Sequence, residues 1–149
     1  MATFLEQVIN GLTIGSFYAL VALGYSMVYG VMKLINFAHG DLFALGSYLG
    51  YTLLIMGSSM VTARFGLWGG MALAMLFALL GVGAAGVLME RVAYRPVYPA
   101  GRLPLVVSAL GMSIFLQNAI MAIWGARPQA YPADVVPSSR FAVLGVPVT

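Results

Sequence analysis

The sequence predicts an all-α protein, a polytopic bundle of about four transmembrane helices followed by a short proline-rich extramembrane tail. Its composition is the first reason. Hydrophobic residues make up 62% of the chain and charged residues only 7%, whereas a soluble domain carries roughly a quarter charged residues. This is too little charge to cover a surface that faces water.

The spacing of the charges is the second reason. The uncharged windows between them are at residues 7–32, 42–63, 65–89 and 103–126. A helix needs about 20 mostly apolar residues to cross a bilayer core of roughly 30 Å, and each window is long enough. A membrane β-strand would alternate apolar and polar residues over about ten positions, and the first window does not. The predicted helical spans are about 8–31, 42–56, 67–89 and 103–124.

The segments between the spans are predicted to be short and polar. Residues 57–64 are read as a small polar connection, and residues 90–102 as a surface loop in which Pro96 and Pro99 stop the preceding helix. In the tail, the apolar run 141–148 can form a short strand or hairpin.

Basic residues give an orientation, because cytoplasmic loops of membrane proteins carry an excess of Lys and Arg. The 90–102 loop has one Glu and three arginines, Arg91, Arg95 and Arg102. We therefore expect this loop and the 33–41 turn in the cytoplasm, with Tyr94 and Tyr98 at the membrane interface. Residues 1–125 would form the transmembrane region, and residues 126–149 an incomplete outer loop.

The turn at 33–41 holds the only His and the only Lys of the chain. Ionisable residues near membrane depth are costly, so they suggest function. The candidate residues are Asn36, His39, Gly40 and Asp41. A structural role is favoured, in which Asn36 or Asp41 caps the next helix and Gly40 permits a tight turn. Two other roles stay open: lining a transport path, and relaying protons between His39 and Asp41.

Two pairs of glycines have the spacing that lets membrane helices approach closely. These candidate packing residues are Gly11 and Gly15 in the first span, and Gly46 and Gly50 in the second.

The sequence argues against an enzyme and against a bound cofactor. It has no Cys, one His and four scattered acids, which is too few for a metal coordination set. It has no nucleophile with a paired base, no phosphate-binding loop and no dinucleotide fingerprint. An intramembrane enzyme that uses His39 and Asp41 would be the remaining catalytic alternative.

Five stretches of the chain carry a resemblance to a known family. They are Asn10–Leu20, Gly24–Gly30, Ile35–Asp41, Glu90–Pro96 and Ser108–Asn118. In order and spacing they resemble the permease subunits of branched-chain amino acid ABC importers, the Liv type, over nearly the whole chain. The combination of Asn-Phe-Ala-His-Gly-Asp with Glu-Arg-Val-Ala-Tyr-Arg-Pro some fifty residues later is specific.

The resemblance implies a set of partners in the bacterial inner membrane. Such a subunit pairs with a second, similar permease; two cytoplasmic ATPase subunits bind the ATP; and a periplasmic protein delivers the substrate. The substrate would be a branched-chain amino acid or a related small amino acid or amide. The 126–149 segment would lie near the periplasmic protein.

The length of the chain departs from the family. Members are about twice as long, and their second half holds further spans and the helix that couples to the ATPase. We therefore expect this chain to correspond to the N-terminal half of a permease, as a fragment or a naturally short protein. The alternative is a self-contained four-helix inner-membrane protein, such as a small channel or an assembly factor.

Overall fold

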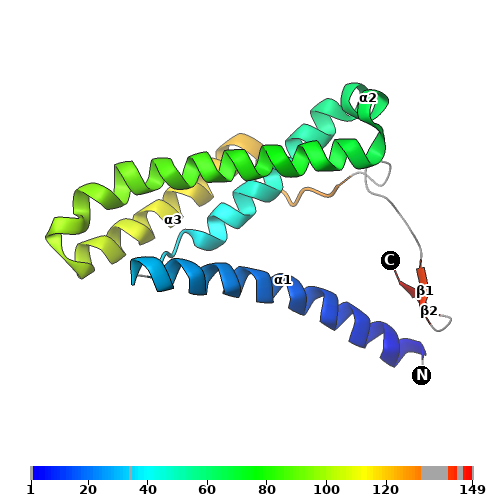
Figure 1. The fold of residues 1–149 in the computed structure, drawn as a ribbon, viewed down its shortest axis with the longest axis horizontal. Helices are drawn as coiled ribbons and strands as arrows, with labels where there is room; N and C mark the ends of the chain where they lie inside the picture. The colour runs from blue at the N-terminus through cyan, green and yellow to red at the C-terminus, as the bar shows by residue number, and fades with distance from the viewer. Residues whose placement is uncertain (1, 34, 132–140, 144–145, 149) are drawn as a thin grey trace.

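The computed structural model describes residues 2–33, 35–131, 141–143 and 146–148. Its elements, in chain order, are α1 (Ala2–Met32), α2 (His39–Met89), the short π-helix η1 (Glu90–Tyr94), the 3₁₀-helix η2 (Arg95–Ala100), α3 (Arg102–Trp124) and the strands β1 (Phe141–Val143) and β2 (Val146–Val148). Helices α2 and α3 pack together, and α1 runs along one side and approaches them near its C-terminal end (Figure 1).

The membrane-spanning character of the chain follows from three helical segments. Within the described residues, the segments long and apolar enough to cross a bilayer are Phe4–Val31, Arg64–Ala100 and Arg102–Trp124. The expected second span, 42–56, is also helical and forms part of α2. The prediction of an all-helical bundle is therefore confirmed, with four helical segments in the described part of the chain.

Helix α2 contains a sharp bend at Gly66. Its backbone angles are φ 69° and ψ 176°, which are not helical, and they divide α2 into a first arm (39–65) and a second arm (67–89). Only glycine adopts such a positive φ without strain. The prediction of a polar connection at 57–64 was wrong, because the helix continues through these residues and the chain turns at Gly66 instead.

The two arms of α2 pack side by side in opposite directions. Gly46 faces Val82, since a Cβ placed on Gly46 would lie 3.1 Å from the Cγ2 of Val82. Further along, the Leu49 side chain covers Gly81, where an added Cβ would lie 2.6 Å from Leu49 Cδ1. Small residues thus allow the arms to approach closely, as is usual for helices in membranes.

The segment at 90–102 is helical rather than a loop, which corrects the sequence prediction. After Met89 the helix widens into η1 and then tightens into η2. Pro96 lies at the start of η2, where a missing backbone N–H costs little. The chain then turns at Gly101, whose φ is 100°, and enters α3.

The core lies between the start of α2, its far end and α3. The buried side chains at its centre are Ala38, Met89, Tyr94, Leu105, Ala109 and Leu116. Strands β1 and β2 form an antiparallel pair in which Pro147 stands opposite Ala142; the predicted hairpin turn between them lies outside the described residues.

We predict that Gly46→Leu will destabilise the fold, because the new side chain has to displace Val82 from the contact between the arms. Overpacking of this kind costs about 1–3 kcal/mol. The measurement is the thermal unfolding midpoint of the purified chain in detergent. The matched control is Gly83→Leu on the same helix, where an added Cβ meets nothing within 4 Å. Equal midpoints for both variants would contradict the packing role of Gly46.

Candidate functional site

The turn between α1 and α2 begins at Lys33 and is closed by backbone hydrogen bonds. Lys33 has a left-handed φ of 53°, and its N–H donates to the Tyr29 carbonyl over 2.8 Å. The His39 N–H donates to the Asn36 carbonyl over 3.1 Å, and α2 starts at His39. Gly40 therefore lies within the first turn of a helix and has no positive φ, so the expectation that it permits a tight turn was wrong.

Asn36 joins this turn to the far end of α2. Its side-chain oxygen Oδ1 accepts hydrogen bonds from the Ala38 N–H at 3.1 Å and from the Tyr94 hydroxyl at 2.7 Å. Asn36 is only 7% exposed and Tyr94 only 3%. In a low-dielectric interior an amide oxygen without donors is costly, so Tyr94 and Asn36 stabilise each other's burial.

Asp41 interacts with α3 instead of capping α2. The N-terminal capping residue of α2 is Ala38, which has no capping side chain of its own. The side chain that accepts a backbone N–H at this helix start is that of Asn36, which bonds to Ala38, whereas the carboxylate of Asp41 is directed to α3. The Asp41 carboxylate accepts a hydrogen bond from the Ser113 hydroxyl, and the Gln117 amide donates to Ser113 Oγ over 3.1 Å. This links the start of α2 to the middle of α3.

His39 packs against α1. Its ring meets the Tyr25 ring edge-on, with centroids 5.1 Å apart. It also lies directly over Gly24, since a Cβ on that glycine would be 2.7 Å from His39 Nε2. In the described part of the chain no hydrogen bond joins His39 to Asp41, and a proton relay between them stays a prediction.

Polar side chains from four helices thus gather at the start of α2. We call this cluster the polar junction; it comprises Tyr25 of α1, Asn36, His39 and Asp41 before and within α2, Tyr94 of η1, and Ser113 and Gln117 of α3. It offers hydroxyl and amide groups and a single carboxylate. No three His, Cys, Asp or Glu side chains come together within the described ranges in a way that could hold a metal ion.

The predicted packing glycines fall into two groups. Gly46 contacts the second arm of α2, as described above, and Gly50 is covered by Tyr131, whose hydroxyl would lie 3.6 Å from an added Cβ. By contrast, Gly11 and Gly15 have nothing within 4 Å of an added Cβ. Within the described residues, only the second pair therefore makes packing contacts.

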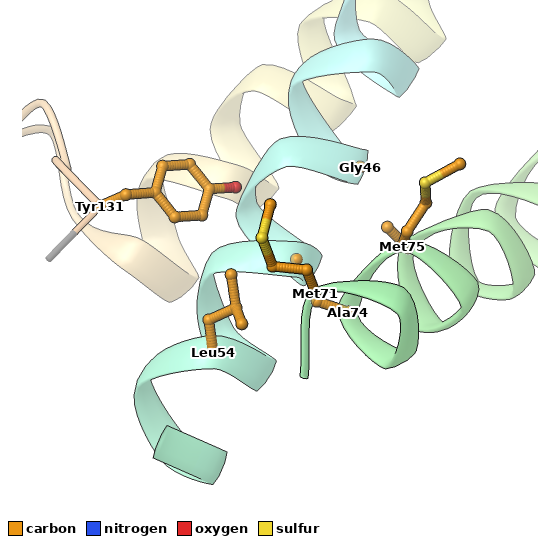
Figure 2. A pocket seen from close by; sticks show the side chains of 8 residues that line it. Gly46, Leu54, Met71, Ala74, Met75 and Tyr131 are labelled. Atoms are coloured by element: carbon orange, nitrogen blue, oxygen red, sulfur yellow. The ribbon is translucent and has the colours of Figure 1, made fainter. Parts of the chain in front are cut away.

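A cavity of about 320 Å³ separates the two arms of α2 beyond Gly46. Figure 2 shows Leu54 of the first arm on one side and Met71 and Ala74 of the second arm on the other, with the Tyr131 ring reaching in from the segment after α3. The Tyr131 hydroxyl donates to the Ser47 carbonyl over 2.8 Å. Tyr131 thus connects the segment after α3 to the first arm of α2.

Tyr94, Ser113 and Gly24 are three of the residues at the site that were not singled out in the sequence as site residues. Tyr94 was expected at the membrane interface and is instead buried beside Asn36. Ser113 and Gly24 lie inside apolar spans, where a lone small residue gives little signal. Each of the three lies within a stretch that carried the family resemblance, and Ser113 has Gln117 four residues on, on the same face of the helix.

These features define a multi-span membrane protein with a polar junction between its helices, of which Asn36 and Tyr94 are buried. The chain matches the family model described as "Branched-chain amino acid transport system / permease component" over residues 7–144. It belongs to this family, which comprises transport permeases and not enzymes.

Curated relatives agree with the family match. The chain is 45% identical over 130 residues to the high-affinity branched-chain amino acid transport system permease protein LivH of Escherichia coli K12, and equally to LivH of Salmonella typhimurium. It is 43% identical over 129 residues to the corresponding protein BraD of Pseudomonas aeruginosa. These alignments cover 87% of this chain but only 41–42% of the relatives. No solved structure matches the chain.

We predict that Tyr94→Phe will lower stability by about 0.5–1.5 kcal/mol, because it removes one of the two donors to Asn36. The measurement is the unfolding midpoint in detergent. Tyr98→Phe is the matched control, since Tyr98 is 42% exposed. The role of the Asn36 contact would be refuted if Tyr94→Phe retained its cost in an Asn36→Ala background.

We predict that Gly24→Ala will loosen the contact of α1 with α2, because the added methyl group collides with the His39 ring. The unfolding midpoint should fall, and it should recover in the double variant Gly24→Ala/His39→Ala. The control is Gly30→Ala, where an added Cβ meets nothing within 4 Å. That variant should be neutral or slightly more stable, because alanine is the better helix former. If the unfolding midpoint fell in Gly24→Ala and did not recover in the double variant, contact with His39 would not be the cause of the destabilisation.

Proposed function

We propose that this chain forms part of the membrane path of an ABC importer for branched-chain amino acids or related small amino acids and amides, in the bacterial inner membrane. The observation that carries the proposal is the family match over residues 7–144. The relatives are named as permease proteins of branched-chain amino acid transport. The chain spans less than half of their length, so it would supply the N-terminal part of a permease.

The partners follow from this class of transporter. A second permease subunit would complete the path, two cytoplasmic ATPase subunits would bind the ATP, and a periplasmic binding protein would deliver the substrate. The 1–125 region would then be the membrane domain, and the 126–149 segment would belong to an outer loop. The basic 90–102 segment would face the cytoplasm, in agreement with the positive-inside rule.

Within this function, the polar junction is the part of the chain best suited to contact a polar substrate. The Asp41 carboxylate accepts a hydrogen bond from the neutral Ser113 hydroxyl and, within the part of the chain that the structure describes, forms no ion pair. A carboxylate in such a setting can hold the ammonium group of an amino acid, since ionisable residues inside membranes commonly mark substrate paths. Asn36 and Tyr94 would hold the turn that presents Asp41.

The second candidate is a self-contained small membrane protein, such as a channel or an assembly factor. The side-chain bonds that join α3 to η1 and α2 within the chain are the observation in its favour. Ion flux through vesicles that contain only the purified chain would support this candidate, whereas uptake that requires ATPase subunits would support the importer.

We predict that Asp41→Asn will abolish uptake of radiolabelled leucine by cells that produce a family-length permease containing this segment together with its partner subunits, while the level of the permease in the membrane stays normal. Asparagine can still accept the Ser113 hydrogen bond, so the helix contact survives and only the charge is lost. Glu6→Gln, a matched loss of a carboxylate near the other end of α1, should transport normally. A reduced membrane level with Asp41→Asn would instead assign Asp41 a structural role.

A further inference from the structure

The second arm of α2 and helix α3 enclose an apolar groove of about 330 Å³. Leu88, Met89 and Val92 line one side, and Met112, Phe115 and Leu116 line the other. Met89 and Leu116 are buried and form the floor, whereas the side chains of Leu88, Val92 and Phe115 are more than half exposed and form the walls. The groove is therefore a long apolar surface that other atoms can reach from the side.

The groove ends at a cluster of positive charge. Val92 lies between Arg91 and Arg95, and α3 begins at Arg102; all three arginines are exposed. Among the described residues none of them forms an ion pair, and the only acid in this segment is Glu90. The segment thus carries three positive charges against one negative charge, all at one end of the groove.

The register between the two helices places these charges beyond one end of the apolar wall. The Ser108 hydroxyl donates to the Ala93 carbonyl over 2.7 Å, so these residues lie at the same level. At a rise of about 1.5 Å per residue, the wall from Ala85 to Val92 runs roughly 10 Å along its helix, and Arg102 lies roughly 9 Å beyond Ser108 in the direction away from Phe115. The apolar wall and the arginines thus follow one another along the helix axis.

We propose that this groove binds one anionic phospholipid, with an acyl chain along Leu88, Val92 and Phe115 and the headgroup phosphate against the arginines. Guanidinium groups bind phosphate with paired charge-assisted hydrogen bonds. Basic pockets between membrane helices are known to hold anionic headgroups. Charge complementarity selects an anionic lipid over a zwitterionic one, and the length of the apolar groove selects a lipid over a free anion. The proposal does not depend on the transported substrate.

The test compares two lipids with the same acyl chains, phosphatidylglycerol and phosphatidylethanolamine, by native mass spectrometry of the purified chain in detergent. Phosphatidylglycerol should remain bound at lower concentrations. The double variant Arg91→Gln/Arg95→Gln should weaken its binding about fivefold for each arginine removed, and leave phosphatidylethanolamine unaffected. The control Arg64→Gln/Arg127→Gln removes the same charge at the opposite end of the helices and should change neither affinity.

A second pair of variants tests the acyl-chain contact. Leu88→Gln, on the exposed wall of the groove, should weaken the binding of both lipids. Leu80→Gln is equally exposed on the same helix but outside the groove, and it should change neither. Neither substitution disturbs the core, so both variants should remain folded.

Four results would overturn the proposal. Equal binding of the two lipids by the unmodified chain would remove the role of charge, and this comparison needs no variant. Equal losses in the two double arginine variants would show a general effect of net charge. Full competition by soluble glycerol phosphate would reveal a simple anion site. A dimer that excludes lipid and dissociates with Leu88→Gln would show that a second copy occupies the groove.

Discussion

The hydrogen bond from Tyr94 to Asn36 is the interaction on which the arrangement of the helices depends. It joins residues that are 58 positions apart in the chain and closes the open end of the hairpin that the two arms of α2 form. Gly66 closes the other end by reversing the chain direction. Between these two points the arms are in contact through glycine and other small residues. Both ends of the hairpin are thus fixed within the chain itself.

The remaining helices are attached to this hairpin to different degrees. Helix α3 is held by side-chain hydrogen bonds at three levels, from Ser108 to Ala93, from Ser113 to Asp41 and from Trp124 to Thr52. It therefore forms one unit with α2. Helix α1 meets that unit chiefly where His39 lies against Gly24 and Tyr25, and most of its length is exposed. The polar junction lies where the loosely attached helix meets the firmly packed pair, so movement of α1 would alter the surroundings of His39 first.

Much of the fold could be predicted from sequence, because the length of an uncharged window directly reflects the thickness of a bilayer. The family could also be recognised, since its motifs are specific. The connections were harder. The polar residues at 57–64 and the prolines at 96 and 99 suggest loops, yet helical geometry persists through both segments, because backbone groups at a membrane need internal partners. The polar contacts were harder still. The pairing of Ser113 with Asp41 depends on the tertiary arrangement of two helices, which no local pattern encodes.

The bend at Gly66 also limits where residues can be inserted into or deleted from this chain. Where a long loop joins two helices, an inserted or deleted residue is absorbed by the loop. Here a single glycine separates the arms, so no loop is present that could absorb an inserted or deleted residue. One extra residue in either arm would turn the rest of that helix by about 100° and move it about 1.5 Å along its axis. Gly46 would then leave the surface that faces Val82. The number of residues between Gly46 and Val82 is therefore as constrained as the identities of Gly46 and Val82 themselves.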